Sequence, residues 1–460
     1  MINLKQIFEP KSIAVIGASR EPSKVGHAIV KNFVAGGFPG DIYPINPNAT
    51  EILGLKCYKN VSSIKGKIDC AIIAIPAQFV PGALEECGKK GVRGIVLITG
   101  GFSEVGNVEG ERQVAEIAKR YDLSIIGANC LGVLNPAARV DGIFLPVYKM
   151  ARPRVGDIGF ISQSGAVGGC IVDLAAYAGI GISKFVSYGN ATVIDETHLL
   201  EYLGKDEKTR IIVMYLEGVR RGKEFIKVAK EIAKKKPIIL LKAGVSKKGA
   251  EAVKSHTASL AGSAEAYRAV MKQCKIIEAK TLMELFYFAK IFDQPLPKGN
   301  RVGIVTNGGG YGVLATDAVE LFELELANFS EESKKILRKN LPNYVNIRNP
   351  LDVVGDADSA RYDLAINTLM EDPNVDIIVV VVLFQTVAID SRVISVITRA
   401  ADQKKKPIVV ISTGGEYTEV HKRIFDSYGI PTYHSPTAAL DAVQKFVWYA
   451  DFLKKNKRIG

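Results

Sequence analysis

A histidine and a glutamate in this chain have the chemistry to carry a phosphoryl group. His256 lies in a polar, small-residue-rich segment, residues 254–262, downstream of Lys242, Lys247 and Lys248. We predict that this segment is a loop after a strand, where functional groups concentrate. A neutral imidazole there can act as a nucleophile toward phosphorus. The alternative is a histidine with a structural role only.

Glu217 directly follows an apolar run, residues 211–216, that predicts a buried strand. Ligands of parallel sheets bind at the carboxyl ends of the strands. A carboxylate there could hydrogen-bond an imidazole nitrogen, fix its tautomer and support a phosphorylated ring. A solvated loop glutamate is the alternative. The remaining histidines have no comparable surroundings, and we expect surface or packing roles for His27, His198, His421 and His434.

A glycine loop at residues 17–26 follows a predicted strand, 12–16, and opens a predicted helix, 25–35. Helix N-termini present free N–H groups and favour phosphate. The loop lacks the GxGxxG pattern, and the second strand ends at Asn46 and Pro47 without the carboxylate that holds the ribose of NAD. NAD binding, and with it a dehydrogenase, is therefore disfavoured. Arg20 and Lys24 suit a more heavily phosphorylated nucleotide, and a structural tight turn is the alternative.

Two further glycine-containing loops, residues 162–165 and 306–312, also end a predicted strand and begin a predicted helix. Small residues at such a junction let the backbone approach an anion closely. Each loop alone is a weak signal. Together they suggest two helix ends directed at one or two phosphate positions.

The elements around these loops alternate between short apolar runs and amphipathic stretches, which is typical of βαβ units with a parallel sheet. We predict strands at 12–16, 41–45, 70–75, 94–99, 124–126, 158–162, 184–187, 211–216, 237–242, 301–306, 376–384 and 407–412. Predicted helices cover 25–35, 108–121, 166–178, 312–321 and 437–452. The proline-rich stretch 137–153 is expected to be irregular, and 295–299 to be a linker. We therefore predict an α/β chain of three domains: 1–136, 151–292 and 299–460.

The second and third predicted domains look like an internal repeat. Residues 159–168 align with 303–312, and the Lys-Lys-Lys-Pro run at 234–237 aligns with the run at 404–407. Both landmarks occur in the same order, which favours duplication over convergence.

Composition narrows the class of protein further. The 460 residues carry a formal net charge of +12, which favours a polyanionic partner. The lysines are scattered along predicted helices rather than clustered with aromatic residues, so nucleic acid is disfavoured. No apolar run reaches the length of a membrane helix, and no signal peptide is visible at the N-terminus. The six cysteines form no CxxC pair and no zinc pattern, so we expect reduced, mostly buried thiols in the cytoplasm and no metal site.

Taken together, these motifs resemble the α subunits of ADP-forming acetyl-CoA (acyl-CoA) synthetases and, more distantly, succinyl-CoA synthetase. The resemblance covers essentially the whole chain. It rests on residues 15–20, 43–47, 98–103, 127–132, 162–165, 217–218, 255–257 and 307–310. The fold that it implies is an N-terminal Rossmann-like domain that binds coenzyme A, followed by two flavodoxin-like ligase domains.

The resemblance also implies site residues. The coenzyme A group comprises Gly17, Ala18, Ser19, Arg20, Lys24, Asn46, Pro47, Pro76, Ile98, Asn129 and Cys130. The phosphate group comprises Ser162, Gln163, Ser164, Gly165, Asn307, Gly308, Gly309 and Gly310. His256 matches the position that becomes a phosphohistidine, and Glu217 matches the carboxylate that stabilises it. The implied reaction converts acyl-CoA, ADP and phosphate into acid, coenzyme A and ATP through an acyl phosphate.

Every segment of the chain is assigned without an ATP-grasp nucleotide domain. The resemblance therefore implies a separate β subunit that carries this domain, in an α2β2 heterotetramer, with Mg2+ accompanying ADP or ATP on that subunit. A non-catalytic, coenzyme A-binding regulatory subunit is the alternative function. The preferred acyl group cannot be inferred from the sequence, because pocket shape is a tertiary property.

Overall fold

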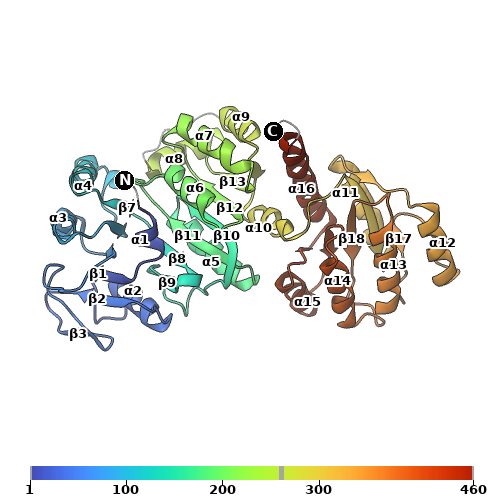
Figure 1. Cartoon of the computed structure of the whole chain (residues 1–460), viewed down its shortest axis with the longest axis horizontal. Helices are drawn as coiled ribbons and strands as arrows, with labels where there is room; N and C mark the ends of the chain where they lie inside the picture. The colour runs from blue at the N-terminus through green and yellow to red at the C-terminus, as the bar shows by residue number, and fades with distance from the viewer. Residues whose placement is uncertain (1–2, 258–263, 458–460) are drawn as a thin grey trace. The chain divides into compact units, whose positions relative to one another are not determined.

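The computed structural model describes residues 3–257 and 264–457, and it divides the chain into two compact units, Met1–Lys280 and Thr281–Gly460. Strands and helices alternate along the whole chain (Figure 1). The predicted α/β class is confirmed, because three sheets are built mainly from parallel strands. Among the described helices, none is both long enough and apolar enough to cross a membrane.

The first sheet has the order β2-β1-β5-β6-β7, and all its strands are parallel. Its strands are β1 (Ser12–Ile16), β2 (Asp41–Ile45), β5 (Cys70–Ile73), β6 (Gly94–Leu97) and β7 (Ser124–Gly127). The helices that alternate with them are α2 (Val25–Ala35), α3 (Val80–Lys90) and α4 (Val108–Tyr121), and α1 (Lys5–Phe8) precedes β1. A small hairpin, β3 (Glu51–Ile52) and β4 (Leu55–Lys56), follows β2. Because β1 lies between β2 and β5, the crossovers leave it in opposite directions and open a crevice at its carboxyl end.

The second sheet has the order β14-β13-β12-β10-β11-β8-β9. Its parallel strands are β10 (Val155–Ser162), β11 (Ile182–Ser187), β12 (Ile211–Leu216), β13 (Ile238–Lys242) and β14 (Ile277–Ala279). The helices are α5 (Gly165–Tyr177), α6 (Glu196–Lys205), α7 (Gly222–Ala233), α8 (Lys247–Thr257) and α9 (Ala264–Cys274). Helix α8 corrects one expectation, because the backbone of His256 belongs to this helix and not to a loop.

Two short strands extend this second sheet: β8 (Gly132–Asn135) pairs antiparallel with β11, and β9 (Val140–Asp141) pairs antiparallel with β8. The sequence instead predicted an irregular stretch at 137–153 and placed residues up to 136 with the first domain. The prediction was wrong for β9, because a strand of two residues is too short to show an alternation of apolar and polar residues. The chain thus contributes to the second sheet before β10 begins.

The third sheet, in the second unit, has the order β16-β15-β18-β19-β20, with β17 paired to β15. Its strands are β15 (Arg301–Thr306), β16 (Glu325–Leu326), β17 (Leu351–Asp352), β18 (Ile377–Val381), β19 (Ile408–Ile411) and β20 (Thr432–Tyr433). The helices are α10 (Leu282–Lys290), α11 (Gly309–Leu321), α12 (Glu331–Asn340), α13 (Ser359–Glu371), α14 (Arg392–Asp402), α15 (Glu416–Ser427) and α16 (Pro436–Lys457). Helix α13 lies against α12 and α14, whereas α16 lies against α10 and α11.

The internal repeat is confirmed by strand order. In chain order, β10, β11, β12, β13 and β14 correspond to β15, β16, β18, β19 and β20, and the two sheets arrange these strands identically. The aligned lysines also make the same contacts. Lys236 Nζ donates to the carbonyls of Leu203 and Asp206, and Lys406 Nζ donates to those of Leu369 and Asp372.

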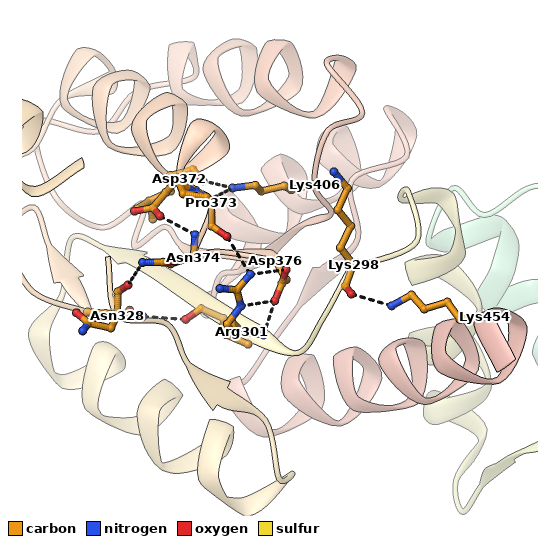
Figure 2. Close-up of polar contacts among 12 residues, drawn as sticks. Lys298, Arg301, Asn328, Asp372, Pro373, Asn374, Asp376, Lys406 and Lys454 are labelled. Atoms are coloured by element: carbon orange, nitrogen blue, oxygen red, sulfur yellow. Dashed lines mark hydrogen bonds and ion pairs between the residues drawn. The ribbon is translucent and has the colours of Figure 1, made fainter. Parts of the chain in front are cut away.

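One ion pair of the repeat is reversed in polarity between the two copies. In the first copy, Asp157 near the start of β10 pairs with Arg210 before β12. In the second copy, Arg301 at the start of β15 pairs with Asp376 before β18, with Nε–Oδ2 at 2.7 Å and Nη2–Oδ1 at 3.0 Å (Figure 2). Each copy therefore has an ion pair at this place, formed with opposite polarity.

Buried thiols agree with the expectation from the sequence. Five of the six cysteines are buried and free, and Cys170 on α5 is free and exposed.

Candidate functional site

The first glycine loop is held tightly against its neighbours. Gly17 has φ +93°, and a Cβ on it would lie 2.2 Å from the carbonyl oxygen of Ala74. A Cβ on Gly26 would lie 1.9 Å from the carbonyl oxygen of Gly17. Both positions therefore require glycine, because any larger residue would push the loop away from α2 and from β5.

Two side chains clamp the same loop. Asn46 Nδ2 donates to the carbonyl of Ala18 at 2.8 Å, and Nδ1 of His27 lies 3.0 Å from the carbonyl of Ser19. Arg20 and Lys24 are exposed, as phosphate-binding side chains should be. His27 is buried on α2, and its contact with the loop is a positioning role that the sequence analysis missed. The spacing of eight residues between Ser19 and His27 carried no recognisable signal.

The second glycine loop connects β10 to α5. Ser164 is the N-cap of α5, and its Oγ accepts the N–H of Val167 at 3.3 Å. The N–H groups of Gly165 and Ala166 in the first helical turn are left to bind an anion. Ser162 is buried behind the loop and donates to the carbonyl of Ser164 at 2.6 Å. Two serine side chains therefore fix the strand-to-helix junction by hydrogen bonds.

A cavity of about 660 Å³ joins the first domain to this helix start. Among the predicted residues, those that line it are Pro76, Ile98, Asn129, Cys130, Gln163, Ser164, Gly165 and Glu217. The other wall residues are Val25, Ala74, Ile75, Thr99, Gly100, Leu131, Phe144, Leu145, Ala166, Gly189 and Asn190. Gly17, Ala18, Ser19, Arg20, Lys24, Asn46, Pro47 and Ser162 do not line the cavity. Gly17 is connected to it through its contact with Ala74.

Glu217 is placed by Gln163. The Gln163 Oε1 atom accepts the N–H of Glu217 at 2.8 Å and the N–H of Gly218 at 3.1 Å, and the hydroxyl of Tyr188 lies 3.2 Å away. The glycine loop and the carboxylate are therefore joined by one side chain, although 54 residues separate them in the sequence. This role of Gln163 goes beyond the phosphate contact that the sequence suggested.

The charge of Glu217 lies in a mostly buried environment. The residue is 7% exposed, and Lys242, which is 5% exposed, lies close enough for their charges to attract. Burial lowers the pKa of Lys242, and the Glu217 charge acts in the opposite direction. Burial, with a smaller contribution from Glu217, raises the pKa of Tyr215 to about 12. Lys242 Nζ also lies 4.5 Å from the centre of the Tyr267 ring.

The side chain of His256, the predicted nucleophile, lies outside the described residues, as do residues 258–263 of its segment. The helix that contains its backbone, α8, approaches the short turn η2 (Ser103–Val105) of the first domain.

A polar network joins the first two domains beside the cavity. Asn190 Nδ2 donates to Glu104 Oε2 at 2.6 Å and to Glu111 Oε2 at 3.0 Å. Burial acts to raise the pKa of Glu104, but hydrogen bonds from Asn190 and from the backbone outweigh it and lower the pKa below its usual value. Arg220, two residues beyond Gly218, donates to the carbonyl of Asn190. The sequence analysis missed this network because its bonded partners are distant in the sequence, with 86 residues between Asn190 and Glu104.

The third loop belongs to the second unit and repeats the scaffold of the second. Asn307 Oδ1 accepts the N–H of Leu383 at 2.9 Å, as Gln163 accepts that of Glu217. The register of β18 on β15 makes Leu383 the counterpart of Glu217. Gly309 lines a separate cavity of about 390 Å³ in this unit, whereas Asn307, Gly308 and Gly310 do not. The second copy thus keeps a side-chain amide, Asn307 in place of Gln163, but has Leu383 in place of the Glu217 carboxylate.

Comparison with known proteins places each part of the chain in a family. Residues 11–136 match a CoA binding domain, residues 155–292 a succinyl-CoA ligase like flavodoxin domain, and residues 302–453 a ligase-CoA domain. The chain is 41% identical, over 97% of its length and 98% of the relative's, to subunit alpha of acetate–CoA ligase [ADP-forming] II from Pyrococcus furiosus. The chain belongs to the family of ADP-forming acetate–CoA ligase α subunits.

Other members of this family differ in length. The chain is 42% identical to acetate–CoA ligase [ADP-forming] I from Archaeoglobus fulgidus. The match covers 99% of this chain but only 65% of that protein. Among solved structures, acetyl-coenzyme A synthetase 1 of Ca. Korarchaeum cryptofilum, in complex with phosphate and ADP, superposes with a TM-score of 0.92. The two chains are 36% identical, and each is covered over 99% of its length.

Proposed function

We propose that this chain is the catalytic α subunit of an ADP-forming acyl-CoA synthetase. The observation that carries the proposal is the single cavity in which loops of the CoA binding domain face the start of α5 and Glu217. In the proposed reaction, acyl-CoA, ADP and phosphate yield acid, coenzyme A and ATP. The alternative, a regulatory subunit that only binds coenzyme A, would use the first domain without the α5 end of the cavity.

The first step takes place at the α5 end. Phosphate binds to the N–H groups of Gly165 and Ala166, where the helix dipole stabilises its charge. The thioester binds along the first domain, past Pro76 and Asn129. A phosphate oxygen attacks the thioester carbonyl, the C–S bond breaks, and the products are acyl phosphate and the thiolate of coenzyme A. Fixed N–H groups stabilise the charge that develops, because they need no reorganisation.

The second step transfers the phosphoryl group to His256. An imidazole nitrogen attacks phosphorus, the P–O bond to the acyl group breaks, and the acid leaves as a carboxylate. Glu217, held through its backbone by Gln163, accepts a hydrogen bond from the other ring nitrogen and balances the imidazolium charge. The phosphoryl group then passes to ADP on a partner subunit, with Mg2+ on the nucleotide.

The cavity wall also favours one class of acyl group. Among the described residues that line the cavity, none is lysine or arginine, and Glu217 is the single charged residue. A second carboxylate on the acyl group would therefore be desolvated beside an anion. Monocarboxylic acyl groups fit this wall better than dicarboxylic ones.

Phosphohistidine labelling tests the proposal. The chain and its partner subunit, incubated with [γ-32P]ATP, should yield an acid-labile label on this chain. His256→Ala should abolish the label, and His434→Ala, a histidine outside the proposed site, should retain it. Persistence of the label in His256→Ala would refute the assignment of His256. Binding of coenzyme A without any label on the wild type would instead support the regulatory alternative.

The proposed partner is an ATP-grasp β subunit in an α2β2 heterotetramer in the cytoplasm. Support comes from relatives that are named as α subunits and from longer relatives that the chain spans only in part. The chain alone should form no ATP from acyl-CoA, ADP and phosphate, and addition of the β subunit should restore ATP formation. Light scattering of the mixture measures the stoichiometry, and a mass other than that of two α and two β chains would exclude the heterotetramer.

A further inference from the structure

We propose that Phe144 sets the upper size of the acyl group that the enzyme accepts. This inference rests on the proposed function and assigns a specificity-determining residue within its cavity. Phe144 and Leu145 lie just after β9, in a segment that the sequence predicted only to be irregular, and both line the cavity at α5.

The two residues form an apolar wall with Leu131 beside the first turns of α5. The N–H of Phe144 donates to the carbonyl of Leu131 at 3.4 Å. A Cβ on Gly165 would lie 3.4 Å from Leu131 Cβ, and a Cβ on Gly169 would lie 3.3 Å from Leu145 Cδ1. The wall therefore lies at the helix start where the proposed phosphate binds.

Buried polar side chains hold this wall in place. Asn32, which is 2% exposed, donates through Nδ2 to the carbonyls of Ile143 at 2.7 Å and Leu145 at 3.0 Å. Arg152 Nη2 donates to the same Leu145 carbonyl at 2.7 Å, and its Nε pairs with Asp141 Oδ2 at 2.7 Å. A larger acyl chain cannot push the backbone of the wall aside without breaking these bonds.

The position of the wall determines which part of the substrate it meets. The thioester carbonyl must approach phosphate at α5, so the acyl chain beyond the carbonyl extends among Leu131, Phe144 and Leu145. Apolar pockets discriminate by size, at about 10–200-fold for one methylene group. A phenyl ring in the wall therefore limits acyl length, and its removal creates room for a longer or aromatic acyl group.

The test compares phenylacetyl-CoA with acetyl-CoA as substrates of the complete enzyme, in an assay of ADP- and phosphate-dependent ATP formation. Phe144→Ala should raise the ratio of their kcat/KM values by at least about tenfold. Tyr148→Ala is the matched control, because Tyr148 lies in the same segment, is 75% exposed and does not line the cavity. Its ratio should equal that of the wild type, and the affinity of both variants for free coenzyme A should be unchanged.

Phe144→Leu provides a milder variant if the alanine variant is unstable, and it should shift the ratio in the same direction. A ratio within about twofold of the wild type in a folded variant that cleaves acetyl-CoA would overturn the proposal while leaving the proposed function intact. Absence of thioester cleavage by the wild type would instead refute the proposed function. In that case calorimetry would decide the role of Phe144. Phe144→Ala should raise the affinity for phenylacetyl-CoA relative to that for coenzyme A, and an unchanged relative affinity would overturn the proposal.

Discussion

Gln163 offers a direct test of how the candidate site is positioned. Its Oε1 atom accepts the N–H groups of Glu217 and Gly218 and faces the hydroxyl of Tyr188, which is fully buried. Gln163→Leu keeps a side chain of similar size but removes the acceptor. The two backbone N–H groups then lose their partner at the carboxyl end of β12.

The expected magnitude follows from these two groups. A partly buried N–H left without a partner costs about 1–3 kcal/mol, so the turn after β12, with two such groups, should lose about 2–6 kcal/mol of local stability. At 1.4 kcal/mol per factor of ten, even the lower limit corresponds to about thirtyfold. Displacement of Glu217 should also reduce formation of phosphohistidine by about ten- to a hundredfold, because catalysis depends on placement within about 1 Å.

Hydrogen exchange is the assay of choice, because the single tryptophan, Trp448, belongs to the second unit and would not report on the first. The amides of Glu217 and Gly218 should exchange at least about thirtyfold faster in Gln163→Leu. Gln163→Glu should preserve their protection, because a carboxylate still accepts both hydrogen bonds. The same variant should lower activity, because it adds a negative charge beside Glu217 and the phosphate position.

Gln294→Leu is a matched control in the second unit. Gln294 Oε1 accepts the N–H of Ile408 at 3.0 Å, and Nε2 donates to the carbonyl of Gly429 at 2.7 Å. This variant should weaken its own unit without changing exchange at Glu217. Exchange at Glu217 and Gly218 that is unchanged in Gln163→Leu would refute the positioning role, and equal losses of activity in both leucine variants would refute a specific effect on the site.

Three further predictions follow from the fold. The lowered pKa of Glu104 means that its contribution to stability is complete above about pH 4.5 and is lost as the pH falls. Glu104→Gln should therefore lower the free energy of unfolding in urea at pH 7, with a smaller difference from the wild type at pH 3.5. A difference that is the same at both pH values would contradict this. Gly17→Ala should weaken coenzyme A binding at least about tenfold in calorimetry, because the loop must move away from Ala74. Gly54→Ala is the control and should leave binding unchanged, because Gly54 also has a positive φ but has open space around it. Arg301→Asp should lower the free energy of unfolding in urea by about 1–3 kcal/mol, and the added Asp376→Arg should restore most of it, because the other repeat already has this polarity. A double variant no more stable than Arg301→Asp would disprove the equivalence of the two polarities.

Much of the architecture could be predicted from local sequence patterns. The strand at 211–216 and the helix at 108–121 have the predicted bounds, because a fully apolar run and an amphipathic period both leave a local signal. The repeat was visible for the same reason, since its glycine loops and its Lys-Lys-Lys-Pro runs are contiguous. The loop residues proposed to bind coenzyme A, and Glu217, were predicted from such contiguous motifs.

Other features were beyond local patterns. The strand β9 is too short to show a period and depends on its pairing with β8 and, through it, on β11. His256 was predicted to lie in a loop because its segment is polar and rich in small residues, yet its backbone continues α8.

The sequence by itself determined most of the order of strands and helices, the three glycine loops and the residue types proposed to bind phosphate, because these properties reside in neighbouring residues. Only the tertiary structure decided which of them share a cavity. Gln163 reaches Glu217, Asn190 reaches Glu104, and Asn32 reaches the carbonyls beside Phe144 across 54, 86 and 111–113 residues. The contact of Gln163 arises because the neighbouring parallel strands β10 and β12 bring their carboxyl ends to one edge of the sheet. No spacing along the chain encodes any of these contacts.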